Sequence, residues 1–197
     1  MVEQSNEKFN KTEKAEAKKE VSVTKKLAGT GVFAALAFVV SFLEFPIFPA
    51  ASFLKLDFSL VFVLLAGFIF GPVSGIGVSA VKELLRFVMG SSTGGVGEVA
   101  NFIVTLAFIV VPTVIYRYKK GFSTVIITLI IGCVLETAAA LIANRFINFP
   151  LYMGDKAAEV FASLWQFVLL FNLIKTLAVS LVTIMLYKKV SALIKKI

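Results

Sequence analysis

Long apolar runs, each about the length of a membrane-spanning helix, dominate the chain, and short polar, proline- or glycine-containing segments separate them. A helix needs about 20 mostly apolar residues to cross a bilayer. The pattern therefore predicts an all-α integral membrane protein with six transmembrane helices. The expected spans are Leu27–Phe45, Leu56–Phe70, Val73–Met89, Glu98–Tyr116, Phe122 to about Arg145, and Phe167–Tyr187.

The segments between these runs contain the residues that break helices. Glu44–Lys55 holds two prolines and is expected to form an irregular loop. Gly90–Gly97 is rich in glycine and serine and is expected to be a flexible loop. Phe146–Gln166 is expected to connect the last two spans near a membrane interface, because Tyr152 and Trp165 suit that environment.

Residues 1–24 differ from the rest of the chain. They carry five lysines and five glutamates and show no apolar periodicity, which predicts a disordered, charged cytoplasmic tail. The apolar run that follows is long and has no small-residue cleavage pattern, so the segment is not typical of a secretory signal. Residues 25–197 are expected to form the six-helix, substrate-binding transmembrane domain.

The net charge of +8 is distributed as membrane topology predicts and not as nucleic-acid binding would require. With six spans, every basic cluster falls on the side that holds both termini. Positive residues favour the cytoplasmic side, so both termini are expected there and the protein is expected in a bacterial plasma membrane. The clusters are Lys25–Lys26, Arg117 with Lys119–Lys120, Lys188–Lys189 and Lys195–Lys196.

The composition excludes much catalytic chemistry. The chain has no histidine and a single cysteine, Cys133, so it lacks the commonest general base, the commonest metal ligand and an internal disulfide. The glycine-rich loop lacks the ending of a phosphate-binding P-loop. We therefore expect no catalytic residues, no metal, no cofactor and no ATPase activity, and any uphill transport would take its energy from a partner.

Polar residues in the last two apolar runs are the strongest candidates for a ligand site, because such groups are costly in hydrocarbon. Asn172 and Lys175 are three residues apart and share one helix face. Glu136 and Asn144 share a face of the preceding helix. At ~1.5 Å rise per residue, Glu136 and Lys175 fall at similar depth and are a candidate ion pair. The polar groups cluster in the half facing outward, which predicts an outward-facing pocket.

Structural alternatives stay open for each of these residues. For Asn172 the less favoured alternative is a hydrogen bond to a neighbouring helix. For Glu136 and Lys175 a purely structural ion pair is as well supported as a role in ligand contact. For Lys82, Glu83 and Arg86, a structural or surface role is favoured over ligand contact.

Several short motifs resemble the substrate-binding S components of energy-coupling factor (ECF) vitamin transporters, over about residues 25–197. The motifs of the family are Leu56-Asp57-Phe58-Ser59, Phe70-Gly71-Pro72-Val73-Ser74-Gly75 and Val81-Lys82-Glu83-Leu84-Leu85. Pro150-Leu151-Tyr152 and Phe171-Asn172-Leu173-Ile174-Lys175 are similar to the riboflavin-specific members of this family.

The resemblance implies a subunit that captures riboflavin outside the cell and delivers it through a membrane coupling subunit (EcfT-like) and two ATPase subunits. It places Asn144, Asn172 and Lys175 on the isoalloxazine ring, with the loop Phe53–Leu56 closing over the ligand. Side-chain amides suit the ring, whose imide edge alternates acceptors with an N–H donor. Further ligand-binding candidates are Lys55, Leu56, Asp57 and Asn101. Small residues of the first helix, matching the family's docking surface, are Gly31, Ala34 and Ala35.

Other functions remain as alternatives. The alternative within the same class is an S component whose ligand is another small vitamin or a flavin such as FMN. An intramembrane lipid-modifying enzyme is disfavoured by the missing histidine, the lone cysteine and the lack of paired aspartate motifs. A standalone channel or secondary carrier is disfavoured by the apolar inner half and the lack of an internal repeat.

Overall fold

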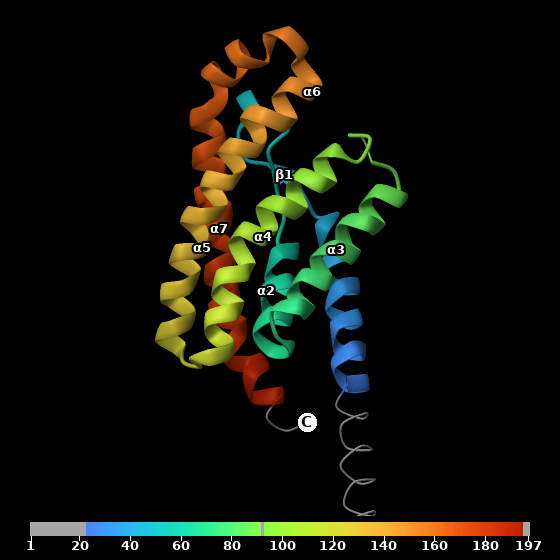
Figure 1. The fold of residues 1–197 in the computed structure, drawn as a ribbon, viewed down its shortest axis with the longest axis vertical. Coiled ribbons are helices and arrows are strands. Elements are labelled where there is room, and N and C mark those ends of the chain that lie inside the picture. The colour runs from blue at the N-terminus through green and yellow to red at the C-terminus, as the bar shows by residue number, and fades with distance from the viewer. Residues whose placement is uncertain (1–22, 92, 195–197) are drawn as a thin grey trace, which may run out of the picture.

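The computed structural model describes residues 23–91 and 93–194, and these form a helical bundle with one short β-ribbon (Figure 1). The predicted tail, residues 1–24, lies almost wholly outside the described residues. The elements in chain order are a first helix (Val23–Ser41), β1 (Phe45–Pro46), the 3-10 turn η1 (Pro49–Ala51), β2 (Lys55–Leu56), α2 (Ser59–Phe70), α3 (Pro72–Val88), α4 (Val96–Tyr118), α5 (Phe122–Ala143), the π-helical turn η2 (Asn144–Asn148), α6 (Phe149–Met153), the 3-10 turn η3 (Gly154–Lys156) and α7 (Ala157–Ile194).

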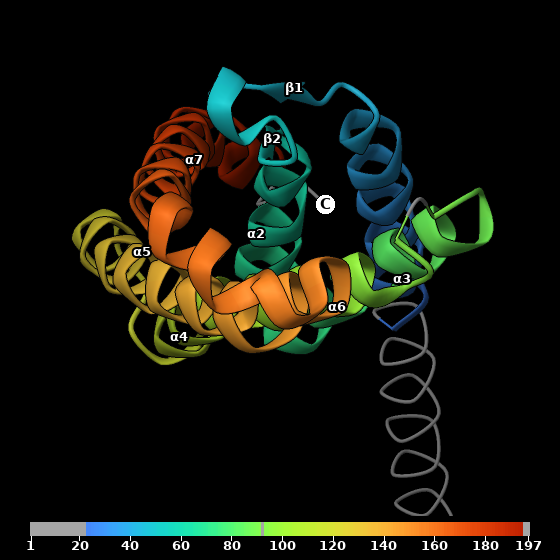
Figure 2. The same ribbon diagram turned by 90° about the horizontal axis from the view of Figure 1, so that it is seen from above.

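The long helices run alternately toward opposite ends of the molecule (Figure 1). The α2–α3 and α4–α5 connections lie at the end where the first helix begins and α7 finishes. The β-ribbon and α6 lie at the opposite end, which we call the ribbon end. Seen from above, the ribbon and α6 lie over α2, α4, α5 and α7, while the first helix stands to one side (Figure 2). The first helix packs on α2 through Phe33, whose ring contacts Phe62 and Phe70.

The tight turn between α2 and α3 follows from the Gly71-Pro72 sequence. Gly71 has φ +100°, a conformation that favours glycine, and Pro72 occupies the first turn of α3, where a missing N–H costs little. One turn later the backbones of the two helices approach closely, since a Cβ on Gly75 would lie 3.1 Å from the Cα of Gly67. Small residues permit such close packing of membrane helices.

An aromatic group joins three helices at the end opposite the ribbon. Phe68, Tyr116 and Tyr187 meet edge to face, with ring centroids 5.1 to 6.1 Å apart, and the two tyrosine hydroxyls are hydrogen-bonded to each other. Edge-to-face packing stabilises such clusters beyond the area they bury. This group ties the ends of α2, α4 and α7 together.

The predicted third and fourth spans agree with α3 and α4 to within two residues at each end. The first span was expected to extend to Phe45, but its helix ends at Ser41, and Phe45–Pro46 instead pairs with Lys55–Leu56 as an antiparallel ribbon. The second span was expected to begin at Leu56, but α2 begins at Ser59, whose N–H donates to the carboxylate of Asp57.

The segment expected to be a connection, Phe146–Gln166, is largely helical in the structure: it contains α6 and the first turns of α7. The loop Gly90–Gly97, expected to be flexible, is held by hydrogen bonds in its described part. There Glu98 accepts from both Ser91 and Thr93.

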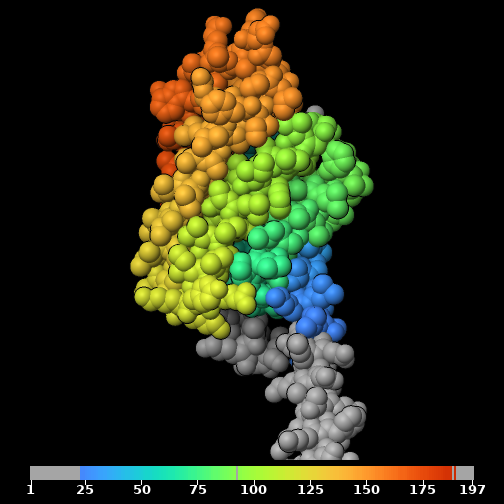
Figure 3. Space-filling model, in the orientation of Figure 1, coloured from blue at the N-terminus to red at the C-terminus, as the bar shows by residue number. Residues whose placement is uncertain are grey.

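Three helical stretches are long and apolar enough to cross a membrane: Val23–Ser41, Val96–Tyr118 and Phe122–Tyr187, the last of which runs from α5 into α7. Helix α2 is apolar but shorter. Large apolar side chains such as Ile127, Ile130 and Val134 of α5 are exposed on the outside, as expected for lipid contact. The space-filling view shows α3, α4 and α5 forming one continuous outer face (Figure 3).

Candidate ligand-binding site

A small cavity near the ribbon end, the central cavity, contains most of the predicted ligand-binding residues. Its volume is ≈ 180 Å³. Asn144, Asn172 and Lys175 all line it, and so do Lys55 and Asn101. The remaining lining residues are Phe53, Leu54, Gly97, Ala100, Val104, Ala140, Asn148 and Phe171. Residues that are far apart in the sequence thus converge on one space, as the helix-face argument predicted for α5 and α7.

A second cavity of ≈ 340 Å³, the outer cavity, adjoins the first and shares four of its lining residues. Its other walls include Phe149, Tyr152 and Met153 of α6, so the Pro-Leu-Tyr motif lies at this site. Ligand pockets for small molecules usually measure about 300–1,000 Å³. The central cavity alone is below that range, whereas the two together form a slot of suitable size. The shared residues are Phe53, Gly97, Asn144 and Asn148.

Helix α7 presents an amide and an ammonium to the central cavity. Asn172 donates one amide N–H to the carbonyl of Val168 at 2.8 Å, which leaves its Oδ1 and its second N–H for other partners. Lys175 is only 8% exposed, and among the described residues its ammonium makes no hydrogen bond or salt bridge. A buried charge is stable only when it is paired or hydrogen-bonded. Lys175 is therefore placed to donate to a ligand.

The π-helical turn η2 positions a second amide. Asn144 donates to the carbonyl of Ala140 at 2.8 Å, and its Oδ1 accepts from Asn148 at 3.3 Å. Turns of π-helix are common at functional sites, because the extra residue redirects side chains. Asn148 was not among the residues predicted from the sequence. Its spacing of four residues from Asn144 was the available signal, since residues four apart share a helix face.

The predicted ion pair between Glu136 and Lys175 is not formed as a direct contact. Glu136 is fully buried, neither of its carboxylate oxygens has a hydrogen-bond partner, and no salt bridge joins it to Lys175. The two side chains still interact electrostatically. Glu136 lies one helical turn below Ala140 and does not line the cavity. Of this pair, therefore, only Lys175 brings a charge to the cavity wall.

Residues 25–187 match the family model for the ECF transporter, substrate-specific component. The chain belongs to this family. It is 36% identical to the riboflavin transporter RibU of Staphylococcus aureus (strain TCH60), over 88% of this chain and 94% of that protein. It is 29% identical to the riboflavin transporter FmnP of Bacillus subtilis (strain 168), over 87% of this chain and 95% of that protein.

A solved structure, described as "Structure and mechanism of the S component of a bacterial ECF transporter", has the same fold. It superimposes with a TM-score of 0.76 at 37% sequence identity, covering 87% of this chain and 98% of that one. The family predicted from the sequence motifs is confirmed: the chain is an ECF S component, which is a membrane protein.

A buried polar network supports the α4 wall of this S component. Asn101 donates to Oε1 of Glu83 at 2.5 Å, and Lys82 Nζ lies 2.6 Å from the same oxygen and 3.3 Å from Ser59 Oγ. Lys82 and Glu83 are both buried and neither lines the central cavity. These contacts agree with the structural role favoured for this pair from the sequence.

Two predicted ligand residues, Leu56 and Asp57, do not line either cavity. Leu56 is buried in an apolar cluster that also contains Phe149. Asp57 binds the N–H of Ser59 at 2.7 Å and interacts electrostatically with Lys82 and Lys175. The turn into α2 directs Leu56 into a packing contact and Asp57 into a capping contact.

Ion pairs hold the ribbon over the site. Glu44 lies between two cations, with Lys55 Nζ at 2.9 Å and Arg86 Nη2 at 3.1 Å, and Arg86 also donates to the carbonyl of Ser41 at 2.7 Å. These contacts connect the end of the first helix, the ribbon and α3. Lys55, which lines the central cavity, is thereby positioned from outside.

The three predicted docking residues of the first helix face different directions. Gly31 and Ala35 are exposed, one helical turn apart, and a Cβ at Gly31 would meet nothing within 4 Å. Ala34 is 5% exposed and belongs to the main apolar core. Ala34 is therefore a packing residue and not part of an exposed docking surface, because it lies on the face of the helix that packs against the apolar core.

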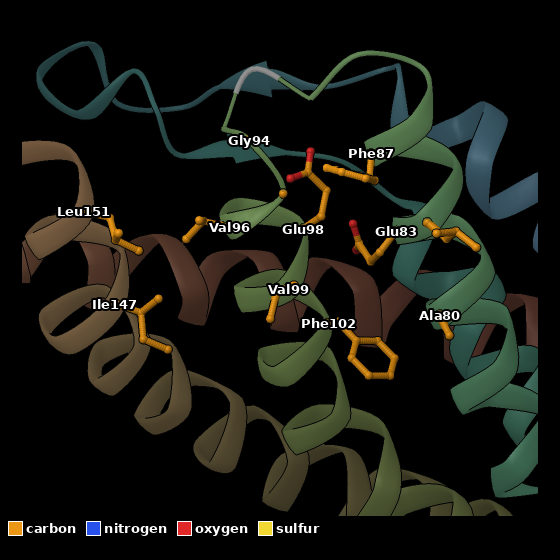
Figure 4. Close-up of a pocket in the computed structure, with 12 residues that line it drawn as sticks. Ala80, Glu83, Phe87, Gly94, Val96, Glu98, Val99, Phe102, Ile147 and Leu151 are labelled. Atoms are coloured by element: carbon orange, nitrogen blue, oxygen red, sulfur yellow. The ribbon is translucent and has the colours of Figure 1, made fainter.

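A third cavity, of ≈ 660 Å³, lies between α3 and α4 and is mostly apolar. Figure 4 shows Phe87 and Ala80 of α3 opposite Val96, Val99 and Phe102 of α4. None of the predicted ligand-binding residues lines it. Both carboxylates on its wall are already engaged: Glu98 accepts the Ser91 and Thr93 hydroxyls, and Glu83 contacts Lys82 and Asn101. The predicted ligand-binding residues that line a cavity lie in the two smaller cavities.

Proposed function

We propose that this S component binds riboflavin in the combined central and outer cavities and serves as the substrate-binding subunit of an ECF-type transporter. The relatives named above support this, since both are riboflavin transporters that align along nearly their whole length. The family consists of transporter components, which favours a transport role over the lipid-modifying chemistry considered from the sequence.

The observation that carries the proposal is the convergence of Asn144, Asn172 and Lys175 on one buried cavity. The imide edge of an isoalloxazine alternates two carbonyl acceptors with one N–H donor. Amides supply both donors and acceptors, and an ammonium supplies only donors. Apolar walls complete such a site by covering the rest of the ring, and Phe53, Leu54 and Phe171 occupy those walls.

Riboflavin is favoured over its phosphate, FMN. A phosphate group requires cationic or backbone N–H partners. Lys82 is engaged by Glu83, Arg86 by Glu44 and a backbone carbonyl, and Lys55 by Glu44. Lys175, which lines the central cavity, is assigned to the ring. The outer cavity has no charged side chain on its walls. An uncharged ribityl chain suits this part of the slot better than a dianion.

The membrane arrangement that we propose is six spans in a bacterial plasma membrane, with both termini cytoplasmic and the cavities facing outward. The alternating helices and the shared end of the described termini are consistent with it. The basic clusters near that end favour the cytoplasmic side. Delivery of riboflavin then depends on partners that the chain does not encode: a membrane coupling subunit and two ATPases, docked in part on the Gly31–Ala35 face.

The proposal is tested by purifying the protein from cells in detergent and recording its visible absorption spectrum. A flavin spectrum, with riboflavin released on denaturation, is expected. Isothermal titration of the ligand-stripped protein should then give saturable riboflavin binding. A colourless protein that gives no heat of binding with riboflavin would rule the function out.

A further inference from the structure

The central cavity is lined by an amide on α4 as well as by those on η2 and α7, and a buried carboxylate sets the orientation of this α4 amide. Asn101 of α4 lines the cavity, and its Nδ2 donates to Oε1 of Glu83 at 2.5 Å. Flipping the amide would bring its carbonyl oxygen against the carboxylate, which places two acceptors together without a proton between them. Glu83 therefore keeps the N–H₂ end of Asn101 on itself, and the carbonyl end is left for the cavity.

Lys82 keeps Glu83 in place for this role. Its Nζ lies 2.6 Å from the oxygen that Asn101 contacts, and it also donates to Ser59 Oγ at 3.3 Å. Both charged residues are buried. A carboxylate is stable at such depth when a cation and hydrogen bonds compensate its lost hydration. The α3 pair is thus a fixed anchor, to which the amide on α4 is attached.

We propose that Glu83 is a positioning residue that makes Asn101 an acceptor for a ribityl hydroxyl group of the ligand. The inference rests on the proposed function. In riboflavin, the ring has a single N–H donor, on the imide edge, and its other polar ring atoms are acceptors. The remaining donors are the hydroxyls of the ribityl chain. Since Asn144 serves the ring from η2, and Asn172 and Lys175 serve it from α7, the acceptor on α4 matches a hydroxyl.

The test compares riboflavin with lumiflavin, which has the same ring but a methyl group in place of the ribityl chain. Full-length protein in detergent is titrated with each ligand, as wild type and as Asn101→Ala, Glu83→Gln and the double variant. Asn101→Ala should weaken riboflavin binding about tenfold, the value of one hydrogen bond, and leave lumiflavin binding unchanged. Glu83→Gln should act in the same direction, because a glutamine amide accepts or donates and no longer fixes the orientation of Asn101.

The double variant separates positioning from general damage. If Glu83 acts through Asn101, the double variant binds riboflavin no more weakly than Asn101→Ala alone. Additive losses, or equal losses for both flavins, would overturn the proposal. Because Glu83→Gln leaves the buried Lys82 without its partner, Lys82→Met with Glu83→Gln provides a charge-balanced second variant with the same expected split. Wild-type protein that binds neither flavin would overturn the proposed function itself, whereas binding of both without the split overturns only this inference.

Discussion

Lys175 of α7 and Glu136 of α5 are both buried and interact electrostatically, yet no salt bridge joins them. The ammonium lines the central cavity, and the carboxylate lies below it without a hydrogen-bond partner. Had the two groups paired, Lys175 would have had less capacity to donate to a ligand. The separation suggests different roles, which two variants test: we expect Lys175 to serve binding and Glu136 to balance its charge at a cost to stability.

Glu136→Gln is expected to raise the thermal unfolding midpoint of the ligand-free protein. Removing the charge avoids the desolvation of a carboxylate, which costs several kcal/mol when no close partner compensates it. The lost attraction to Lys175 is smaller, because the groups are not in contact. Unfolding in detergent, followed by tryptophan fluorescence, measures the change. A clear drop in the midpoint would show that the electrostatic attraction outweighs desolvation.

Lys175→Met is the matched variant on the other side of this pair. It should weaken riboflavin binding by about 1.5–3 kcal/mol, the range for a hydrogen bond to a charged group. Glu136→Gln should leave the affinity close to that of wild type, since Glu136 does not line either cavity. Calorimetric titration of both proteins measures the difference. Equal losses in the two variants would mean that the pair acts as a unit in binding.

Asn172→Ala is expected to weaken riboflavin binding by about 1–3 kcal/mol, because a buried polar group of the ligand would lose its partner. Asn172 is itself buried in the cavity wall, and only one of its donors is used within α7. Ser163→Ala on the exposed part of the same helix is the control and should bind as wild type does. Unchanged affinity in Asn172→Ala would place the ligand elsewhere.

Helix-face periodicity correctly grouped residues that line the central cavity, because it depends only on residues within one helix. Asn172 and Lys175 are close in sequence, and a helix places them together whatever surrounds it. The same holds for Ala140 and Asn144. Depth counting suggested that α5 and α7 would present these groups to a common space, and both helices line the central cavity.

Contacts that depend on side-chain direction between helices were harder to predict. Equal depth suggested a Glu136–Lys175 salt bridge, but depth does not fix the rotation of two helices relative to each other. Similarly, Ala34 and Ala35 are neighbours in sequence, and only the packing against α2 decides that one is buried and the other exposed. The π-helical turn that orients Asn148 has no distinct apolar signature.

Ala35→Arg is expected to abolish transport while leaving riboflavin binding intact. Ala35 is exposed on the first helix, far from the residues that line the cavities, and a large cation there would block close helix docking. Ala34→Arg is the matched contrast and should destabilise the protein itself, because it places a charge in the apolar core. Uptake assays in cells with the coupling subunits, beside titrations of purified protein, measure both. Full uptake by Ala35→Arg would exclude this face from docking.

Gly75→Val is expected to destabilise the α2–α3 hairpin, because the added side chain has no room. A Cβ at Gly75 would lie 3.1 Å from the Cα of Gly67 and 3.2 Å from the carbonyl oxygen of Val63, and these are backbone atoms that cannot move aside without separating the helices. Forcing extra atoms into a packed interior typically costs about 1–3 kcal/mol. Gly77→Val on the same helix is the control, since a Cβ there meets nothing within 4 Å, and it carries the same change in helix propensity. The thermal midpoint of Gly75→Val in detergent should therefore fall well below that of Gly77→Val. Equal midpoints for the two variants would show that the hairpin tolerates a wider spacing.

The same substitution should also affect binding. Because Ser59 at the start of α2 contacts Lys82, separation of the hairpin should loosen the Glu83–Asn101 contact. Riboflavin affinity should therefore decline in Gly75→Val and not in Gly77→Val.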